Sequence, residues 1–552
     1  MVHFHLIDFL VLGLFGLTLT GIIVWVSRKK EDTSSDYFLA GRDATWLAIG
    51  ASIFASNIGS EHVVGLAGSG AQSGMAMAQW EFSGWIILVL AWVFVPFYSH
   101  SKIFTTPEFL EKRYNSAARS FLSIISLISY VFTKVAVTVY AGGLVLKEVT
   151  GIKTMFGIDF FWIGAIGLVV ITAIYTIIGG MRSVLYTSVL QTPVLLVGSM
   201  AILIIGLIKL GGWGEMMHIC QLNVTEHGDP MTSMIRSTKD ATFPWPGAVF
   251  GSMIIGFWYW CTDQYIVQRV LSGKNITQSR RGAIFGSYLK LTPVFIFLIP
   301  GMIAYALKQK GLLTLSSSDA AFPAMVSQIL PIGLKGLVIG GLLAALMSSL
   351  ASLFNSSAML FTIDFYQKYR PGAKEKELVF VGRVATTVVV VLGVLWIPML
   401  RGIGNVLYEY LQQIQSLFAP GIATAFFLGI FFRRITAQGG LWGMISGFSV
   451  GMVRMLFLIF KSGVNPDSVF YKVFIQLNWL YFMLYLVGLS VVVTIVVSLF
   501  TKKPAPGQIK GLTYATLTPE QREETRMSWN KMDVVHSAII VLIIIGAYIY
   551  FW

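Results

Sequence analysis

The feature that most constrains this chain is a run of roughly 20 apolar residues that recurs from one end of the sequence to the other. Each run is long enough to cross a bilayer as a helix, and a backbone inside lipid must satisfy its own hydrogen bonds. Only 12% of the 552 residues are charged, against about 25% in a typical soluble chain. We therefore predict an all-α integral membrane protein.

Hydropathy predicts about 14 transmembrane helices. The first run has no basic residue before it, so we interpret it as a retained helix and not as a signal peptide. The predicted spans lie near residues 6–27, 44–70, 78–99, 118–146, 160–179, 185–208, 246–268, 282–306, 333–363, 380–400, 404–432, 437–460, 474–500 and 533–552.

Basic residues alternate between the loops that join these spans. One set of loops holds about 26 of the 40 Lys and Arg residues, and by the positive-inside rule this set is cytoplasmic. We therefore expect a multi-pass protein of the plasma (cell inner) membrane with both termini extracytoplasmic. The net charge of +14 then reflects orientation in the bilayer, and we expect no nucleic-acid partner and no obligatory protein partner.

Two groups of five helices could form an inverted repeat, because an odd number of helices per unit inverts the second unit. Both units open on a polar helix that contains glycine, at 52–62 and at 251–263. Such segments at matching places indicate the central site of a transporter, although they could also be ordinary helices with a polar packing face. The expected domains are an extra helix with a cytoplasmic loop (1–43), repeat 1 (44–209), an extracellular loop (210–245), repeat 2 (246–432), and C-terminal extra helices (433–552) with a cytoplasmic linker at 501–531.

A cation site is predicted where the first polar helix meets the ninth span. If the helix breaks near Ser56, the carbonyl groups of Ala55 and Ile58 become free to bind a hard cation such as sodium. In the ninth span Ala345, Ser348 and Ser349 share one helical face, so three carbonyl and two hydroxyl oxygens could meet. The alternative is that this stripe of small residues is only a close packing seam.

A second cluster consists of polar and ionisable residues inside the predicted spans. Charged groups in lipid are costly, so they normally face the interior of the bundle and mark a pathway. Such groups suit a neutral, polyhydroxylated solute, for which aromatic rings could supply stacking faces. The ionisable and amide groups are Glu81, Lys290, His62 and Gln412, and the rings are Trp80, Tyr259 and Trp260. The alternative is a structural Glu81–Lys290 pair or a glutamate at the membrane rim.

Several longer motifs stand out along the chain. They are Asp36–Arg42 (DYFLAGR), Ala51–His62 (ASIFASNIGSEH), Gly65–Gly70 (GLAGSG), Pro244–Gly247 (PWPG), Trp260–Arg269 (WCTDQYIVQR) and Ser348–Ser356 (SSLASLFNS). With these motifs the chain resembles the sodium:solute symporter family, and within it the sodium/glucose-type cotransporters. The resemblance covers about residues 7–500 and the last helix.

The resemblance implies a five-plus-five inverted-repeat core like that of amino-acid sodium symporters. It also implies a site for Na⁺ as co-substrate and a site for a monosaccharide. The implied sodium ligands are Ala55, Ile58, Ala345, Ser348 and Ser349, and the implied sugar contacts are Asn57, His62, Glu81, Tyr259, Trp260, Lys290 and Gln412. The implied inner gate is Tyr259, and the implied outer lid comprises Leu66, Trp80 and Tyr408.

Three positions depart from the pattern of the family. Ser188 stands where an acid is common, and Ala351 stands where members with a second sodium site have a hydroxyl, so we expect one sodium ion per sugar. Gly256 replaces a residue that contacts sugar in some relatives, which leaves the fine selectivity open.

These observations predict a symporter that takes up a glucose- or galactose-like sugar by alternating access. The alternatives are a sodium-coupled myo-inositol or polyol transporter, and a transporter-like sugar sensor without net uptake. The chain contains no nucleotide-binding loop and no metalloprotease motif, so we expect an ion gradient as the energy source and no enzymatic activity.

Overall fold

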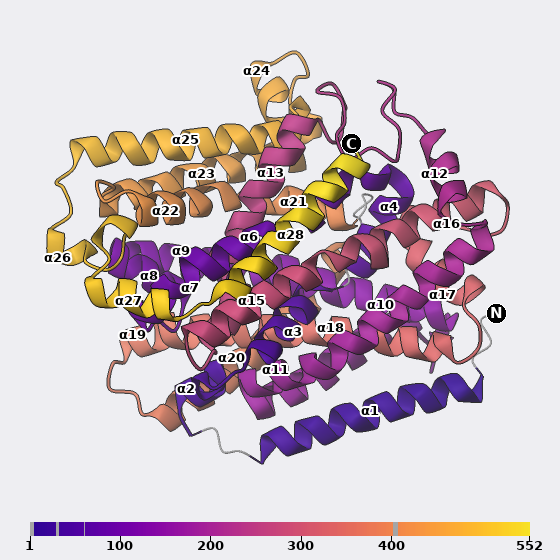
Figure 1. The fold of residues 1–552 in the computed structure, drawn as a ribbon, viewed down its shortest axis with the longest axis horizontal. Helices are drawn as coiled ribbons and strands as arrows, with labels where there is room; N and C mark the ends of the chain where they lie inside the picture. The colour runs from indigo at the N-terminus through magenta and orange to yellow at the C-terminus, as the bar shows by residue number, and fades with distance from the viewer. Residues whose placement is uncertain (1–4, 29–31, 60, 401–406) are drawn as a thin grey trace.

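The computed structural model describes residues 5–28, 32–59, 61–400 and 407–552. Most helices run roughly along the long axis of the molecule, as a bundle (Figure 1). Among the described residues, ten helices are long and apolar enough to cross a membrane, or eleven if a pair bent by 54° at residues 415–419 forms one span. This number is lower than the 14 predicted spans because some spans are interrupted and two of them fall within one helical element.

The N-terminal half begins with α1 (Leu6–Ser27) and continues through the range predicted for the first unit, 44–209. Short π- and 3₁₀-helical turns, labelled η, interrupt several of its helices. The elements are α1 (Leu6–Ser27), α2 (Ser34–Leu39), η1 (Ala40–Arg42), α3 (Trp46–Asn57), η2 (Glu61–Leu66), α4 (Ala67–Ser73), η3 (Gly74–Met77), α5 (Ala78–Glu81), α6 (Gly84–Val89), η4 (Leu90–Phe94), α7 (Val95–Ser101), α8 (Thr106–Arg113), α9 (Ser116–Ser129), η5 (Tyr130–Val135), α10 (Ala136–Thr150), the antiparallel strands β1 (Thr154–Met155) and β2 (Ile158–Asp159), and α11 (Phe160–Leu210).

Helix α11 contains both the fifth and the sixth predicted spans. A straight helix of 51 residues would be about 75 Å long, more than twice the hydrocarbon thickness of a bilayer. The backbone reverses at Gly180, whose φ of 45° favours glycine. Tyr175 then donates to the carbonyl of Met347 (2.9 Å), while Ser188 lies beside Ser348 (3.3 Å between hydroxyl oxygens). Both halves of α11 therefore reach the same level of one neighbouring helix.

The C-terminal half covers the ranges predicted for the second unit, 246–432, and for the helices after it, 433–552. The predicted loop 210–245 includes a helix, α12 (Trp213–Gln221), and the first residues of the predicted span 404–432 (404–406) lie outside the described residues. The other elements are α13 (Trp245–Phe257), η6 (Trp258–Thr262), α14 (Gln264–Leu271), α15 (Ile276–Lys290), η7 (Val294–Leu298), α16 (Ile299–Gln309), η8 (Ser318–Ala320), α17 (Ala321–Ile329), α18 (Leu334–Met359), η9 (Leu360–Tyr366), α19 (Gln367–Tyr369), α20 (Glu375–Leu400), α21 (Leu407–Gln415), α22 (Ala419–Phe431), α23 (Ala437–Ile459), η10 (Lys461–Gly463), α24 (Val469–Tyr471), η11 (Lys472–Gln476), α25 (Trp479–Phe500), α26 (Pro506–Ile509), η12 (Tyr514–Thr516), α27 (Pro519–Met527) and α28 (Lys531–Tyr550).

Glycines permit the closest helix crossings in the core. At the crossing of α4 and α16, a Cβ atom on Gly301 would overlap the carbonyl oxygen of Ala67, and one on Gly70 would overlap that of Leu298. Small residues let backbones approach where lipid supplies no hydrophobic force between helices. This crossing holds the segment that follows the break after α3 against the second unit.

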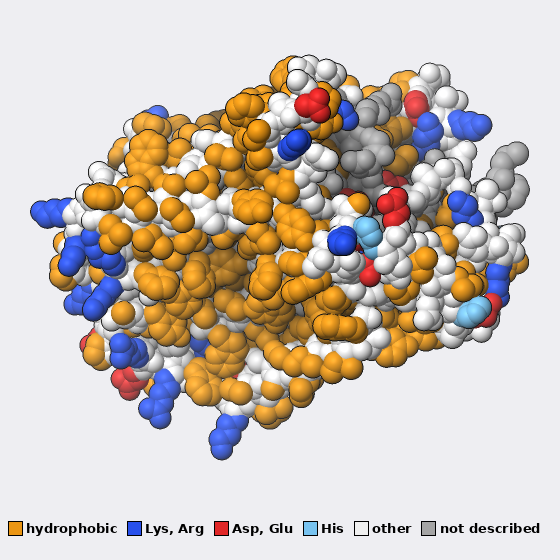
Figure 2. Space-filling view, turned by 90° about the horizontal axis from the view of Figure 1, so that it is seen from above, with side chains coloured by type: hydrophobic (Ala, Val, Ile, Leu, Met, Phe, Trp, Pro, Cys, Tyr) orange, Lys and Arg blue, Asp and Glu red, His pale blue; other side chains and the backbone are white. Residues whose placement is uncertain are grey.

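The surface agrees with a membrane protein that has one basic end. Figure 2 shows a broad hydrophobic band, with Lys and Arg gathered at the end where α26 and α27 lie in Figure 1. Both described ends of the chain lie toward the other side. Asp8 accepts the backbone N–H of Gly333 (2.8 Å) just before α18, and the carbonyl of Phe551 accepts that of Met234 (2.7 Å) in the predicted extracellular loop.

Candidate functional site

The first polar helix breaks where the sequence predicts it. Helix α3 ends at Asn57, and Ile58 has extended backbone angles (φ −79°, ψ 105°). The chain resumes helical structure at Glu61. A break of this kind leaves carbonyl groups without an intrahelical partner, and they can serve as ligands at the centre of a membrane.

The serine face of α18 packs against this break. The Ser349 hydroxyl lies 2.9 Å from the carbonyl oxygen of Ser56 and 3.1 Å from that of Ile58, and it can donate a hydrogen bond to either carbonyl. The hydroxyl oxygens of Ser56 and Ser352 lie 2.7 Å apart, which brings the two helices together one turn further along α18. All four residues are almost completely buried. The contact therefore places uncharged oxygens from two separate halves of the chain at one point.

The remaining predicted sodium residues lie nearby on the same two helices. Ser348 contacts the hydroxyl of Ser188 on α11, the residue noted above as a departure from the acid that is common at this position. Ala55 and Ala345 are buried on α3 and α18, which are packed together. A cluster of neutral oxygens suits a hard monovalent cation better than a transition metal. No group of three acidic, His or Cys side chains within the described ranges could hold a metal ion.

The second polar helix is also interrupted. Between α13 and α14, η6 leads to Asp263, whose backbone is extended (φ −74°, ψ 124°). The Asp263 carboxylate accepts from Tyr130 and lies 2.6 Å from Lys134 Nζ, an ion pair between the two units. The Lys134 ammonium also lies 4.7 Å from the ring centre of Tyr259. The ring of Tyr259, the predicted inner gate, thus lies against the buried Lys134–Asp263 ion pair.

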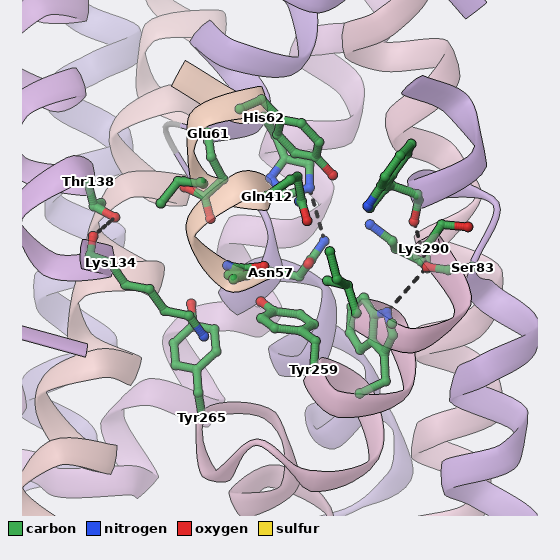
Figure 3. A pocket seen from close by; sticks show the side chains of 18 of the residues that line it. Asn57, Glu61, His62, Ser83, Lys134, Thr138, Tyr259, Tyr265, Lys290 and Gln412 are labelled. Carbon is green, nitrogen blue, oxygen red and sulfur yellow. Dashed lines mark hydrogen bonds between the residues drawn. The ribbon is translucent and has the colours of Figure 1, made fainter. Parts of the chain in front are cut away.

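A cavity lies between the two breaks, and Figure 3 shows most of its lining. The centre of a water molecule can reach about 60 Å³ of it. Six of the seven residues predicted to contact sugar line the cavity, as do two residues of the predicted lid, Trp80 and Tyr408. The six predicted sugar contacts that line the cavity are Asn57, His62, Tyr259, Trp260, Lys290 and Gln412. The lid residue Leu66 is buried but does not line the cavity.

The seventh residue, Glu81, lies behind the wall of the cavity. Its Oε2 atom is 2.6 Å from Lys290 Nζ, its Oε1 atom accepts from the Tyr408 hydroxyl at 2.6 Å, and His62 Nε2 approaches Oε1 at 3.4 Å. Glu81 has no solvent exposure, and all three partners line the cavity. The Glu81–Lys290 pair that sequence analysis left open therefore exists, and it orients groups that face the cavity.

Seven polar or ionisable residues of the lining were not among the predicted contacts or the predicted lid, namely Glu61, Ser83, Lys134, Thr138, Ser252, Tyr265 and Gln415. Glu61 belongs to the polar run 52–62, from which only Asn57 and His62 were predicted to contact sugar. Ser83 accepts from Trp260 Nε1 (3.3 Å) and donates to the carbonyl of Trp80 (2.6 Å). The sequence gives no signal for Ser83 or Thr138, because a single hydroxyl in a helix is common in any packed bundle.

The lining residues also carry buried polar atoms without partners. Within the described part of the chain, no hydrogen bond reaches Glu61 Oε2, His62 Nδ1, Trp80 Nε1 or Gln412 Oε1. Buried polar atoms are normally paired, and each unpaired one is costly. Two of these four atoms are acceptors, one is a donor, and the histidine nitrogen can be either. A ligand with several hydroxyl groups can satisfy all of them, because each hydroxyl both donates and accepts.

Two interrupted helices that meet at a polar cavity inside an apolar helical bundle define a secondary transporter. The model of the sodium:solute symporter family matches residues 37–447, and the chain belongs to this family. It is accordingly a transporter and not an enzyme, and the co-substrate of the family is sodium.

Curated relatives resemble the chain over most of its length. Sodium/myo-inositol cotransporter 2 of Oryctolagus cuniculus is 36% identical over 538 residues, which cover 92% of this chain and 79% of the relative. Sodium/glucose cotransporter 4 of Danio rerio is also 36% identical, over 554 residues, which cover 95% and 83% of the two chains. The sequence is thus equally similar to relatives named for a sugar and for a polyol.

Solved structures share the fold. A substrate-bound, outward-open Na⁺-coupled sialic acid symporter superposes with a TM-score of 0.75 at 23% identity, covering 91% of this chain and 99% of the other. Mhp1, a nucleobase-cation-symport-1 family transporter, gives a TM-score of 0.53 at 14% identity, covering 87% and 98%. The predicted all-α membrane transporter fold is confirmed.

Proposed function

We propose that this protein couples the inward flow of sodium to the uptake of a neutral monosaccharide of the glucose/galactose type. The observation that carries the proposal is the set of unpartnered donor and acceptor atoms on the lining of one buried cavity, next to a cluster of neutral oxygens. Hydroxyl groups of a sugar would satisfy these atoms, and the rings of Trp80, Tyr259 and Trp260 would supply faces for stacking.

Sodium binds, in this proposal, between the break after α3 and the serine face of α18. The ligands are the carbonyl oxygens of Ala55, Ile58 and Ala345 and the hydroxyl oxygens of Ser348 and Ser349. The Ser349 hydroxyl already lies at the Ile58 carbonyl, so little movement is needed to exchange this hydrogen bond for two contacts to an ion. Ser188 and Ala351 replace the ligands of a second site, which supports one sodium ion per sugar.

Transport then follows alternating access between the two units, 44–209 and 246–432. Sodium from outside stabilises the state that is open to the outside, sugar enters the cavity, and the lid of Leu66, Trp80 and Tyr408 closes over it. Sodium then leaves to the cytoplasm, Tyr259 moves, and the sugar follows. Because both ligands favour the same conformation, sodium raises the affinity for sugar and sugar raises the affinity for sodium.

A second candidate substrate is myo-inositol or a related polyol. It is favoured by the relative named sodium/myo-inositol cotransporter 2, whose identity of 36% equals that of the relative named for glucose. The chemistry of the cavity serves both, since each is a neutral ring that carries several hydroxyl groups. We place the transporter in the plasma membrane with both termini outside, as the distribution of basic residues indicates.

The test is uptake into proteoliposomes with an imposed sodium gradient. Labelled D-glucose, D-galactose and myo-inositol are compared under an inward sodium gradient, an inward potassium gradient, and no gradient. We expect accumulation of at least one of them above its external concentration only with sodium. Binding of a sugar without accumulation would favour a sensor, and the absence of both would refute the proposal.

A further inference from the structure

We infer that the Glu61 carboxylate accepts a hydrogen bond from one hydroxyl group of the substrate, and that it makes the site selective for neutral polyhydroxylated solutes over acidic ones. This inference rests on the proposed function and adds a contact that the sequence analysis does not include. Three carboxylates lie at or around the cavity, and they differ in whether each of their oxygens already has a protein partner.

Two of the three carboxylates are fully engaged by the protein. Glu81 uses one oxygen for Lys290 and the other for Tyr408. Asp263 uses one oxygen for Lys134 and the other for Tyr130. Neither has an oxygen that lacks a protein partner, and a substrate that displaced such a partner would break a buried ion pair or hydrogen bond, which is expensive.

Within the described part of the chain, Glu61 differs from the other two carboxylates. It lines the cavity, and its Oε2 atom is buried without any hydrogen-bond partner. The nearby cations cannot compensate its charge fully, because Lys134 and Lys290 are already paired with Asp263 and Glu81. A buried carboxylate oxygen without a hydrogen-bond partner carries a free-energy penalty, and a hydrogen bond donated by the substrate would remove it.

The position of Glu61 suits a substrate that spans the cavity. Figure 3 shows Glu61, Lys134 and Thr138 on one side and Lys290 and Ser83 on the other, with Asn57 and Tyr259 between them. A sugar ring held over the central residues would therefore present hydroxyl groups to both sides at once. On the Glu61 side, the hydroxyl donates in this proposal, because a carboxylate in its ionised form only accepts.

The same charge excludes acidic solutes. A carboxylate on the substrate could not donate to Glu61 and would be repelled by it in a medium of low dielectric constant. A uronic acid should therefore bind more weakly than the corresponding neutral sugar. Replacement of Glu61 by glutamine keeps the shape and an accepting oxygen but removes the charge.

The experiment is a cycle that changes the protein and the ligand together. Purified wild-type protein and the variants Glu61→Gln and Glu61→Ala are reconstituted in proteoliposomes. The measured quantity is how strongly each added ligand inhibits the sodium-driven uptake of the labelled substrate. The ligands are D-glucose, its complete set of monodeoxy and monodeoxyfluoro analogues, and the corresponding myo-inositol analogues. Fluorine can accept weakly but cannot donate, so a fluoro analogue tests the donor role of one hydroxyl.

For the wild type we expect one position at which both the deoxy and the fluoro analogue bind about 10-fold or more weakly than the parent. In Glu61→Ala, the analogue modified at that position should bind within about 3-fold of the parent sugar, because the variant has no carboxylate for this hydroxyl to contact. At the other positions, the differences between analogue and parent should stay as in the wild type. Glu61→Gln should fall between the two, and it should narrow the preference for D-glucose over D-glucuronate.

The matched control is Glu409→Gln. Glu409 is a buried glutamate on α21 that contacts Ser73 and does not line the cavity, so its variant removes the same charge nearby. It should leave the position-specific pattern of the analogues unchanged. If Glu61→Ala and the wild type show the same pattern at every position, the inference is overturned while the proposed function stands. If neither sugar nor polyol inhibits uptake or accumulates, both fail.

Discussion

The Ser349 hydroxyl lies 3.1 Å from the carbonyl oxygen of Ile58, so a helix of the second unit contacts the broken end of a helix of the first. The two residues are 291 positions apart in the chain. Because each belongs to a different unit, an ion held between them would respond to the relative movement of the units. In the proposed mechanism, this contact is the place where sodium binding is coupled to conformation.

The first prediction concerns the serine hydroxyls. The double variant Ser348→Ala/Ser349→Ala should lose sodium-driven uptake, because it removes two of the five proposed sodium ligands. The protein should remain folded, since both side chains are small and alanine fits the same space. Uptake at a series of sodium concentrations measures the effect. Ser357→Ala is the matched control, because its hydroxyl is buried on the same helix and has no partner in the described residues.

Sodium dependence equal to that of the wild type in the double variant would rule out this cation site. A loss of sodium dependence in Ser357→Ala of the same size would show that any missing hydroxyl on α18 disturbs the bundle.

The second prediction separates two adjacent glutamines. Gln412 lines the cavity and has an unpartnered Oε1 atom, whereas its neighbour Gln413 lines a groove elsewhere. Gln412→Ala should raise the sugar concentration for half-maximal uptake by about 5- to 30-fold, which is the range expected for one or two hydrogen bonds. Gln413→Ala should change it less than about 2-fold. Equal effects of both variants would place the sugar somewhere other than the cavity.

The third prediction concerns the buried Glu81–Lys290 pair. Glu81→Ala should lower the free energy of unfolding by about 3–5 kcal/mol, because Lys290 would be left buried without its partner. The double variant Glu81→Met/Lys290→Met should recover most of this stability but should not bind sugar. Thermal unfolding in detergent, together with sugar binding, measures the two effects.

An exposed pair provides the comparison. Glu215 on α12 pairs with Lys310 at 2.6 Å where both side chains are more than a third exposed, and Glu215→Gln should leave the melting temperature nearly unchanged. If the Met/Met variant binds sugar with wild-type affinity, neither member of the buried pair contributes to the sugar site.

The fourth prediction tests the close crossing of α4 and α16. Gly301→Ala places a methyl group against the carbonyl of Ala67 and should destabilise the protein by about 1–3 kcal/mol. Gly167→Ala, in α11, meets no atom within 4 Å and should change stability by less than about 1 kcal/mol, in the favourable direction. Melting temperatures of the two variants, measured in the same detergent, give the difference. Similar melting temperatures would mean that the crossing can widen without cost.

The amino-acid sequence alone predicts the local properties of the chain. Apolar length indicates the helices, because a backbone in lipid must bond to itself within each span. The polar, glycine-containing run 52–62 predicts a break near Ser56, and the helix is broken at Ile58. The matching run 251–263 is also interrupted, at Asp263. The motifs Ala51–His62 and Ser348–Ser356 indicate the family and, through it, residues for a cation site.

The tertiary structure decided which of the polar groups are free to bind a ligand. Glu81 is as prominent in the sequence as Glu61, but Lys290 and Tyr408 occupy its two oxygens, while Glu61 Oε2 has no partner in the described residues. Lys290 and Tyr408 lie more than 200 positions away along the chain from Glu81. Hydropathy and spacing report only near neighbours along the chain, whereas the pairing of a buried charge depends on which distant helix is packed beside it.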